Sequence, residues 1–338
     1  MAKSVTMKEI ADAMGISIVS VSKALSDKEG VGEELRELIK EKASELGYVY
    51  KGGATKKAEE FNDTHNRIGV LTASRYLDKD AFYTGMYENV LKETAKNNEV
   101  CFMESLTDDA ERDLKLPDMV VTNSVDGIIV LGQVSADYME ALKNSTVPYI
   151  FLDFYDARFD VDGVVSDSVY GGYLLTTHVI ESGYKKIAFV GSVMATSSIC
   201  DRYLGYYKAL LENRIEIRED WIIPDRDDEG KFIDLILPKD MPDAFVCNCD
   251  AVAYRLIREL KKQGYCLPDD IAVVGYDDFL YSTMSKPQLT TMRVDMQAMS
   301  HEAYKLIKNK IMKPNLKIGR KVVGGKLIIR ESVKKKHE

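Results

Sequence analysis

Polar and aromatic side chains able to bind a small molecule follow the apolar runs of this 338-residue chain. They comprise carboxylates, amides, a guanidinium group, a hydroxyl and two aromatic rings: Ser74, Phe82, Tyr83, Gln133, Asp153, Asp167, Arg202, Asn248, Asp250 and Asp277. Carboxylate and guanidinium groups form bidentate hydrogen bonds with vicinal hydroxyls, and aromatic rings pack against the C–H faces of a sugar. The set therefore predicts a binding site for a polyhydroxylated small molecule.

Patterns for catalysis, metal binding or cofactor binding are absent from the sequence. The four histidines are scattered, without metal spacing or a nucleophile beside them. Cys247 and Cys249 match neither a zinc site nor a redox motif, and buried free thiols are the simplest interpretation of the five cysteines. No glycine-rich phosphate loop follows a strand. We therefore expect a protein that is not an enzyme and that carries neither a metal nor a cofactor.

The candidate binding residues stand near the ends of strands that alternate with helices from Arg67 onward. Predicted strands cover 68–72, 126–131, 148–152, 186–191, 244–247 and 271–275, and predicted helices cover 82–97, 136–143, 170–182, 201–212 and 252–263. Short apolar strands between amphipathic helices are typical of parallel α/β sheets that are covered on both faces. In such sheets ligands bind beyond the carboxyl ends of the strands, which is where the candidate residues lie.

The length of this alternating pattern predicts two domains rather than one. About 270 residues exceed a single open sheet, so we expect two Rossmann-like subdomains with a ligand-binding cleft between them. The expected boundaries are about 67–162 plus 293–322 for the first subdomain, and about 163–292 plus 323–333 for the second.

Several candidate residues also have a purely structural interpretation. Asp167 and Asp250 stand at strand ends, where an aspartate can instead cap the following helix. Arg202 can form a salt bridge at the rim of the cleft. Phe82 and Tyr83 can pack beneath the helix that they begin.

The first 50 residues predict a small helical head. Thr6 and Glu9 form a capping box at the start of one helix, Gly15 provides the turn, and Ser17 caps a second helix. The residues expected to face inward are Ile10, Ala13 and Met14, then Val21, Ala24 and Leu25, and finally Leu35, Leu38, Ile39, Ala43 and Leu46 of a third helix. Two capped helices joined by a short turn form a helix-turn-helix, which binds DNA through its second helix, although similar helix pairs occur in other helical domains.

Side chains of this head (1–50) and of the following linker (51–66) are placed to contact double-stranded DNA. Ile18 and Val19 begin the second helix, where apolar side chains can meet thymine methyl groups, and Lys23 lies further along it. The complete predicted set is Thr6, Ser17, Ile18, Val19, Ser20, Ser22, Lys23, Tyr48, Lys56 and Lys57. The head has seven Lys and Arg against nine Asp and Glu, so attraction to phosphate is weak and dimerisation must contribute to DNA binding.

The chain resembles the LacI/GalR family of bacterial transcriptional regulators. In the head the resemblance lies in Ile10-Ala11, Gly15-Ile16-Ser17, Val21-Ser22-Lys23-Ala24-Leu25, Gly30-Val31 and Glu45-Leu46-Gly47-Tyr48; further on it lies in Asp167…Gly171, Arg202…Gly205, Gly275-Tyr276-Asp277-Asp278 and Pro287-Gln288-Leu289-Thr290-Thr291. It implies a periplasmic-binding-protein-like fold behind the head, a homodimer, and contacts of Arg202 and Asp277 with effector hydroxyls. The linker departs from the family, because Tyr50-Lys51 replaces its Pro-Asn and no Leu is present to wedge into the minor groove.

Together these patterns predict a ligand-controlled transcriptional repressor whose effector is a sugar or a sugar derivative such as a sugar phosphate. The alternative is a sugar-binding protein of the same two-subdomain fold without a regulatory role. The helical head and the absence of a signal-peptide pattern after Met1 argue against that alternative. Because no apolar run of about 18 residues is present, we expect a cytoplasmic protein without a membrane span.

Overall fold

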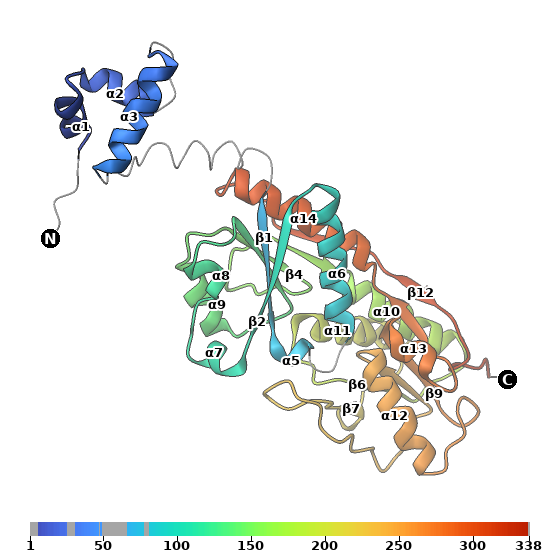
Figure 1. Ribbon diagram of the computed structural model, residues 1–338. Helices are drawn as coiled ribbons and strands as arrows, with labels where there is room; N and C mark the ends of the chain where they lie inside the picture. Colours follow the sequence, from blue (N-terminus) through green and yellow to red (C-terminus); the bar gives the residue numbers. More distant parts are fainter. Residues whose placement is uncertain (1–5, 26–30, 47, 49–65, 78–80, 337–338) are drawn as a thin grey trace. The chain divides into compact units, whose positions relative to one another are not determined.

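The computed structural model describes residues 6–25, 31–46, 48, 66–77 and 81–336. It comprises two compact units, Met1–His65 and Asn66–Glu338 (Figure 1). Lys56 and Lys57, the DNA contacts predicted in the linker, lie outside the described residues.

The first unit contains the predicted helical head. Its described helices are α1 (Met7–Met14), α2 (Ile18–Leu25) and α3 (Glu33–Glu45). The Thr6 side chain accepts from the Glu9 backbone N–H, and the Glu9 carboxylate accepts from the Thr6 backbone N–H at 2.7 Å, which completes the predicted capping box. Gly15 ends α1 with a φ of 63°, a left-handed conformation that glycine adopts without strain. The helix, turn and helix predicted here are therefore confirmed.

The apolar interior of the head is narrower than predicted. It comprises Ile10, Ala11, Val21, Ala24, Leu25, Ile39 and Ala43. Ala11 rather than Ala13 is buried in α1, so the prediction for Ala13 is wrong. In α3, Leu35, Leu38 and Leu46 are exposed, with 55% of Leu38 accessible to solvent. A head of short helices offers α3 only a narrow strip to pack against, and Ile39 and Ala43 fill it.

The first sheet of the second unit is entirely parallel. Its strand order is β11 (Arg320–Val323), β5 (Gly163–Ser166), β4 (Tyr149–Leu152), β3 (Gly127–Leu131), β1 (Arg67–Ala73) and β2 (Val100–Leu106). Every residue of β3 is buried, because the sheet is covered on both faces, and this explains the continuous apolar run Gly-Ile-Ile-Val-Leu. The edge strand β2 is largely exposed, and its apolar run is shorter, Val-Cys-Phe-Met followed by the polar Glu104 and Ser105.

The second sheet repeats this arrangement. Its order is β12 (Lys326–Ile328), β10 (Thr290–Arg293), β9 (Ala272–Asp277), β8 (Ala244–Cys247), β6 (Ile187–Val190) and β7 (Ile222–Ile223). Only the pairing of β12 with β10 is antiparallel among the described strands. The two parallel-sheet subdomains predicted from the alternating pattern are therefore confirmed.

The chain crosses between the two sheets at three points, after β5, after β10 and after β11. Because β5 lies in the first sheet, the first crossing falls at Asp167 rather than at the predicted boundary of 162/163. The strands that border the crossings are neighbours at the edge of each sheet, since β5 pairs with β11 in the first sheet and β10 pairs with β12 in the second. All three connections therefore lie along one edge of the subdomains.

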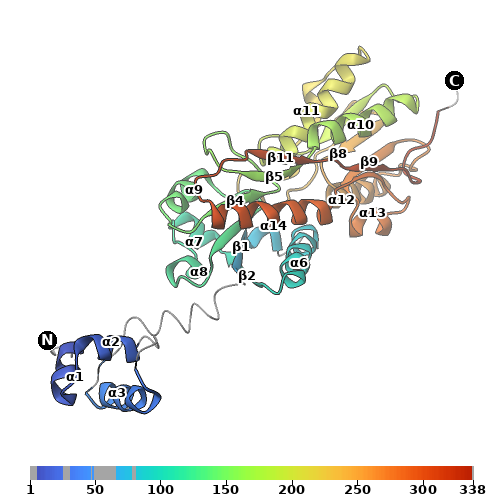
Figure 2. The ribbon, with the colours of Figure 1, turned by 90° about the horizontal axis from the view of Figure 1, so that it is seen from above.

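Helices cover both faces of each sheet. They are α5 (Ser74–Leu77), α6 (Ala81–Lys96), α7 (Asp108–Arg112), α8 (Asp118–Val121), α9 (Ala136–Lys143), α10 (Ser168–Glu181), α11 (Ser197–Glu212), the 3₁₀ turn η1 (Glu219–Trp221), α12 (Asp250–Lys262), α13 (Leu280–Met284) and α14 (Met296–Met312). Helices α6 and α14 pack together over the first sheet, and α10 and α11 form a second pair (Figure 2). In the part of the chain that is described, no helix is long and apolar enough to cross a membrane.

Glycines allow α10 and α11 to approach closely. The backbone of α11 at Gly205 lies against Val169 and Tyr173 of α10, so a Cβ atom there would lie 2.5 Å from the Tyr173 amide nitrogen. Gly172 of α10 lies in turn against the carbonyl of Arg202. This backbone contact fixes the position of α11 and therefore of the side chains that it carries.

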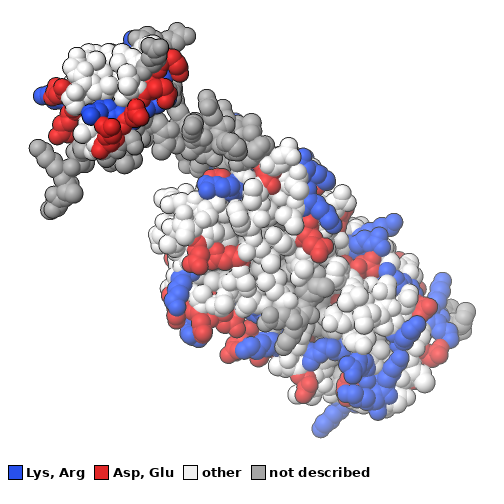
Figure 3. All heavy atoms as spheres, in the orientation of Figure 1, with Lys and Arg blue, Asp and Glu red and all other residues white. Residues whose placement is uncertain are grey.

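Charged side chains of both signs are interspersed over the surface. On the face shown in Figure 3, basic side chains gather over α12, which carries Arg255, Arg258, Lys261 and Lys262. On the same face of the head, acidic side chains form much of the charged surface. This agrees with the excess of Asp and Glu over Lys and Arg in the first 50 residues.

Candidate functional site

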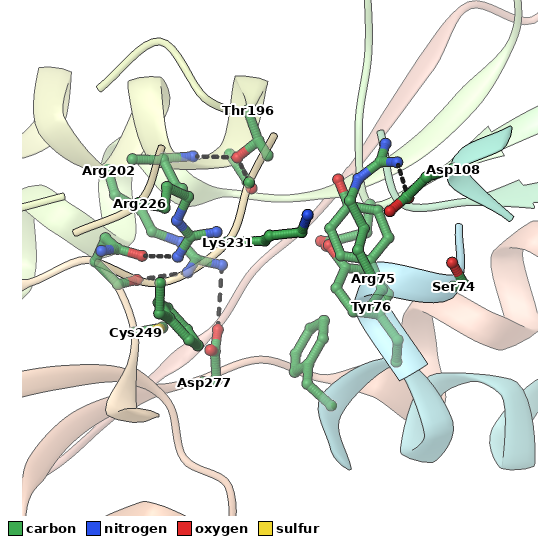
Figure 4. Close-up of a pocket in the computed structure, with 18 residues that line it drawn as sticks. Ser74, Arg75, Tyr76, Asp108, Thr196, Arg202, Arg226, Lys231, Cys249 and Asp277 are labelled. Carbon is green, nitrogen blue, oxygen red and sulfur yellow. Dashed lines mark hydrogen bonds and ion pairs between the residues drawn. The ribbon is translucent and has the colours of Figure 1, made fainter. Parts of the chain in front are cut away.

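A cavity of about 150 Å³ lies between the two subdomains, at the carboxyl ends of their strands. We call it the inner cavity. Its lining residues are Ser74, Arg75, Tyr76, Phe82, Tyr83, Asp108, Asp153, Thr196, Ser198, Ile199, Arg202, Arg226, Gly230, Lys231, Phe232, Asn248, Cys249 and Asp277. Arg202, Arg226, Cys249 and Asp277 form one wall and Ser74, Arg75, Tyr76 and Asp108 the opposite one, with the Lys231 side chain extending between them (Figure 4).

The wall of the second subdomain is built around Arg202 of α11. One Nη of Arg202 donates to the Asn248 carbonyl at 2.6 Å, and the other lies 3.1 Å from the Asp277 carboxylate at the end of β9. Its guanidinium also lies over the Tyr276 ring, 3.9 Å from the ring centre. Burial opposes the charge of Arg202, but the neighbouring Asp277 outweighs it and raises the pKa of the arginine. The group therefore stays cationic although only 5% of Arg202 is exposed.

The Arg202 side chain has hydrogen-bonding capacity left for a ligand. Its Nε is buried and has no hydrogen-bond partner among the described residues. A buried donor without a partner is costly. Because this nitrogen has almost no accessible surface, a ligand oxygen can reach it only if the Arg202 side chain shifts. Asp277 has a φ of 105°, a conformation that residues other than glycine rarely adopt. Such backbone strain is common at binding sites, because it can direct a side chain toward the ligand when an unstrained backbone would direct it elsewhere.

The wall of the first subdomain combines aromatic rings with the carboxylates of Asp108 and Asp153. The Tyr83 hydroxyl donates to Asp153 at 3.1 Å, and Asp153 also has positive φ, 69°. The Tyr83 ring packs on Tyr76 with centres 4.6 Å apart and meets Phe82 edge to face. These rings present an apolar surface opposite the Arg202–Asp277 pair. A ring with polar substituents on its rim can therefore pack on one wall and form hydrogen bonds with the other.

Three further cations stand at the mouth of the inner cavity, and each has an acidic partner. Arg75 contacts Glu111 at 2.5 Å. Arg226 contacts Asp225 at 2.8 Å, and Lys231 pairs with Glu229. Arg226 and Lys231 reach the cavity on a short hairpin in which residues 226 and 232 form a bridge.

The structure places most of the predicted binding residues around the inner cavity. Those that line it are Ser74, Phe82, Tyr83, Asp153, Arg202, Asn248 and Asp277. Gln133 does not line it; its side chain accepts from the Ser197 backbone N–H at 2.8 Å and so joins the two subdomains. Asp167 caps α10 through the Tyr170 N–H. Asp250 is buried beneath the site, where it accepts from the Thr291 hydroxyl and the Phe279 N–H. Helix capping, the structural alternative for these two aspartates, therefore describes Asp167. It does not describe Asp250, which is the first residue of α12 and accepts hydrogen bonds from Thr291 and Phe279 instead.

Other lining residues were not singled out by the sequence. Arg75 and Tyr76 directly follow Ser74, and the turn α5 after β1 directs them into the cavity. The hairpin that carries Arg226, Lys231 and Phe232 has no strand-like pattern before it; its only signal is the polar run Asp227-Asp228-Glu229-Gly230, which is typical of a turn. Asp108, Thr196 and Cys249 also line the cavity.

The buried Asp250 predicts an unusual pH dependence of stability. Burial raises the pKa of its carboxyl to about 7, with Asp278 raising it further and the Thr291 hydrogen bond opposing the shift. The folded protein therefore binds this proton more tightly than the unfolded chain, whose aspartate pKa is about 3.9. Stability should fall as pH rises from about 4 to about 7, by roughly 3–4 kcal/mol from this group. Urea unfolding of Asp250→Asn should lack this decline, whereas the exposed control Asp269→Asn should keep it; equal slopes in all three proteins would contradict the assignment.

The second helix of the head presents an apolar start and a cation. Ile18 is 47% and Val19 64% exposed, and Lys23 lies further along α2 with a half-buried side chain. The Ser17 hydroxyl accepts from the Ser20 N–H at 3.0 Å, so Ser17 caps the helix. Of the other predicted DNA contacts, Thr6 caps α1, Ser20 and Ser22 are half-buried on α2, and Tyr48 packs against the interior of the head.

Comparisons with known proteins match both parts of the chain. Residues 6–50 match the model of bacterial regulatory proteins of the lacI family, and residues 176–333 match a periplasmic binding protein-like domain. An HTH-type transcriptional repressor PurR from Mannheimia succiniciproducens is 26% identical, over 98% of this chain and 99% of its own length. The PurR of Glaesserella parasuis is 27% identical over 92% of this chain and 91% of its own.

Solved structures of similar fold cover nearly the whole chain. The lac repressor dimer bound to operator and the anti-inducer ONPF has a TM-score of 0.65 at 21% identity, and covers 98% of this chain and 100% of its own. The transcriptional regulator CelR in complex with cellobiose has a TM-score of 0.69 at 21% identity, covering 97% and 99%. The helix-turn-helix head thus matches the lacI family of bacterial regulatory proteins, and the domain behind it has the two-subdomain fold of LacI-type transcription regulators.

Proposed function

We propose that this regulator is a homodimeric repressor whose affinity for operator DNA is set by a small polyhydroxylated effector bound in the inner cavity. The observation that carries this proposal is the composition of the cavity, since one wall comes from each subdomain. A ligand that contacts both walls binds the closed arrangement more tightly than an open one. That difference in affinity is what allows a ligand to shift a conformational equilibrium.

The contact between Gln133 and Ser197 supports a cleft that closes. Gln133 follows β3 of the first subdomain, and Ser197 begins α11 of the second. A second link joins the Tyr155 hydroxyl to Asp201 at 2.8 Å, again from the first subdomain to α11. Ligand binding and these links would favour the same closed state. Coupling of this kind typically changes the affinity at a distant site by about 1–3 kcal/mol.

The acceptors and donors of the cavity favour a sugar as effector. Arg202 supplies donors, Asp153 and Asp277 supply acceptors, and Tyr76 with Phe82 supplies an apolar face. A hydroxyl can donate to a carboxylate while accepting from a guanidinium, so paired charges of this kind suit vicinal hydroxyls. The relatives named PurR make a purine base the second candidate. The aromatic side chains Tyr76, Phe82 and Phe232 would be its contacts.

DNA recognition by α2 predicts a large effect for Lys23. Operator sites are first selected from a random duplex library with the full-length protein, and affinities are then measured by fluorescence anisotropy at fixed salt. Lys23→Ala should weaken binding to the selected site by about 1–3 kcal/mol, because a side chain on the second helix reads base edges. Lys40→Ala is the matched control: this lysine lies on α3 near Glu37. Equal affinities of wild type and Lys23→Ala would remove Lys23 from the recognition role.

A further inference from the structure

The inner cavity opens into a larger groove. This outer groove has a volume of about 950 Å³ and shares Arg75, Tyr76, Asp108, Thr196, Arg226, Gly230 and Lys231 with the inner cavity. A cavity of about 150 Å³ is large enough for one six-membered ring such as benzene. A second unit attached to such a ring would have to pass between the shared residues into the outer groove.

The cations at this passage are already neutralised by carboxylates. Arg75 lies between Glu111 and Asp108, at 2.5 Å and 3.7 Å. The carboxylate of Glu111 is 8% exposed, and although its burial opposes ionisation, the hydrogen bond from Arg75 and other contacts lower its pKa. Asp225, which holds Arg226, is fully buried and its pKa is likewise lowered, because Arg226 and its hydrogen bonds outweigh burial. These partners therefore remain charged at neutral pH.

The outer groove carries more acidic than basic side chains among its lining residues. The acidic ones are Asp108, Asp109, Glu111, Asp227, Asp228 and Glu229, and the basic ones are Arg75, Arg112, Arg226 and Lys231. Arg112 is also paired, with Asp109 at 2.7 Å. A phosphate entering this passage would have to displace a carboxylate from its arginine and leave that carboxylate unpaired, which is costly in a partly buried site. An uncharged hydroxyl can form hydrogen bonds with an arginine and its carboxylate without breaking the ion pair between them.

We propose, on the basis of the function proposed above, that the effector is an uncharged glycoside of two units, with one ring in the inner cavity and the second unit in the outer groove. Phosphorylated sugars are excluded because the arginines at the passage are already paired with carboxylates and because acidic side chains outnumber basic ones in the outer groove. Arg202 and Asp277 bind the hydroxyls of the inner ring. The second unit lies along the hairpin of residues 226–232 and the segment Gln133–Ser135.

Isothermal titration calorimetry on the full-length protein tests this inference. The probes are cellobiose, maltose, lactose and trehalose, their component monosaccharides, the corresponding 6-phosphates, and the purine base hypoxanthine. One disaccharide should bind at least tenfold more tightly than its monosaccharide, and the 6-phosphate should bind at least tenfold more weakly than its uncharged parent. The inference is overturned if a sugar phosphate binds as tightly as its parent, if no disaccharide exceeds its monosaccharide, or if no uncharged saccharide binds.

A charge-reversal variant separates the role of the outer groove from binding in the inner cavity. Asp228 and Glu229 line the outer groove alone. Asp228→Lys/Glu229→Lys should raise affinity for the sugar phosphate at least tenfold more than it changes affinity for the uncharged monosaccharide. Glu216→Lys/Glu219→Lys changes the net charge equally at exposed positions that line neither cavity, and should leave both affinities unchanged. An equal gain in sugar-phosphate affinity in both variants would overturn the inference.

The proposed function has its own readout, since sequence-specific DNA binding without effector is measured independently of any saccharide.

Discussion

Replacement of Arg202 by alanine is expected to abolish the effector response and to destabilise the protein. The arginine contacts Asp277 at 3.1 Å, and both side chains are nearly buried. Removal of one partner leaves the other charge buried and uncompensated, which typically lowers the free energy of unfolding by about 3–5 kcal/mol. The inner cavity also loses its main hydrogen-bond donor. Operator binding in the absence of effector should stay near its original strength at temperatures where the variant is folded.

A paired variant distinguishes lost recognition from lost stability. Arg202→Met/Asp277→Asn removes both charges, so urea unfolding should show most of the stability restored. The response of operator affinity to the tightest-binding saccharide, followed by fluorescence anisotropy, should nevertheless be absent. If either variant still responded at the saccharide concentration that suffices for wild type, Arg202 would not belong to the effector site.

Substitution of Gly205 by alanine should destabilise the second subdomain. A Cβ atom at this position would collide with backbone atoms of Val169 and Tyr173, which cannot move as a flexible side chain can. The gain in helix propensity, about 1 kcal/mol, offsets only part of this strain. We expect a net loss of about 2–3 kcal/mol in the free energy of unfolding.

The control for this substitution is Gly324→Ala. Gly324 has no heavy atom within 4 Å of the position of a Cβ, and its φ lies outside the left-handed region. Its replacement should change stability by less than about 0.5 kcal/mol. Because Gly172 packs against the Arg202 carbonyl, Gly205→Ala should also weaken saccharide binding by displacing α11. Equal stability of the two alanine variants would show that the helices can separate without cost.

The sequence was most informative where a local rule determines the structure. The capping box of Thr6 and Glu9 depends on residues three apart, and it forms as predicted. The central strands β3, β6 and β8 are buried on both faces, so their apolar runs identified them. Polar residues directly after these strands lie at the predicted end of the sheets, because parallel strands align their carboxyl ends.

Features that depend on long-range packing could not be predicted in this way. Leu35 and Leu38 fit a helical stripe, but the short helices they would cover do not extend far enough to bury them. Whether Asp250 faces the cavity or the interior depends on Thr291, which is distant in sequence and reaches it only through the pairing of β9 with β10. The hairpin of Arg226 and Lys231 carries no periodic pattern, so nothing local directed it to the cavity mouth.

The three connections between the sheets have a consequence for how such a regulator evolves. Because the connections lie at a single edge, we expect the subdomains to move mainly by rotation about that edge. Every ligand that draws the two walls together must then drive the same rotation, whatever its chemistry. Substitutions in the residues that line the cavity can therefore change which effector binds, while the rotation that binding causes stays the same. Effector recognition, which depends on the cavity residues, and the conformational response, which depends on the connections between the sheets, can therefore evolve separately within one chain.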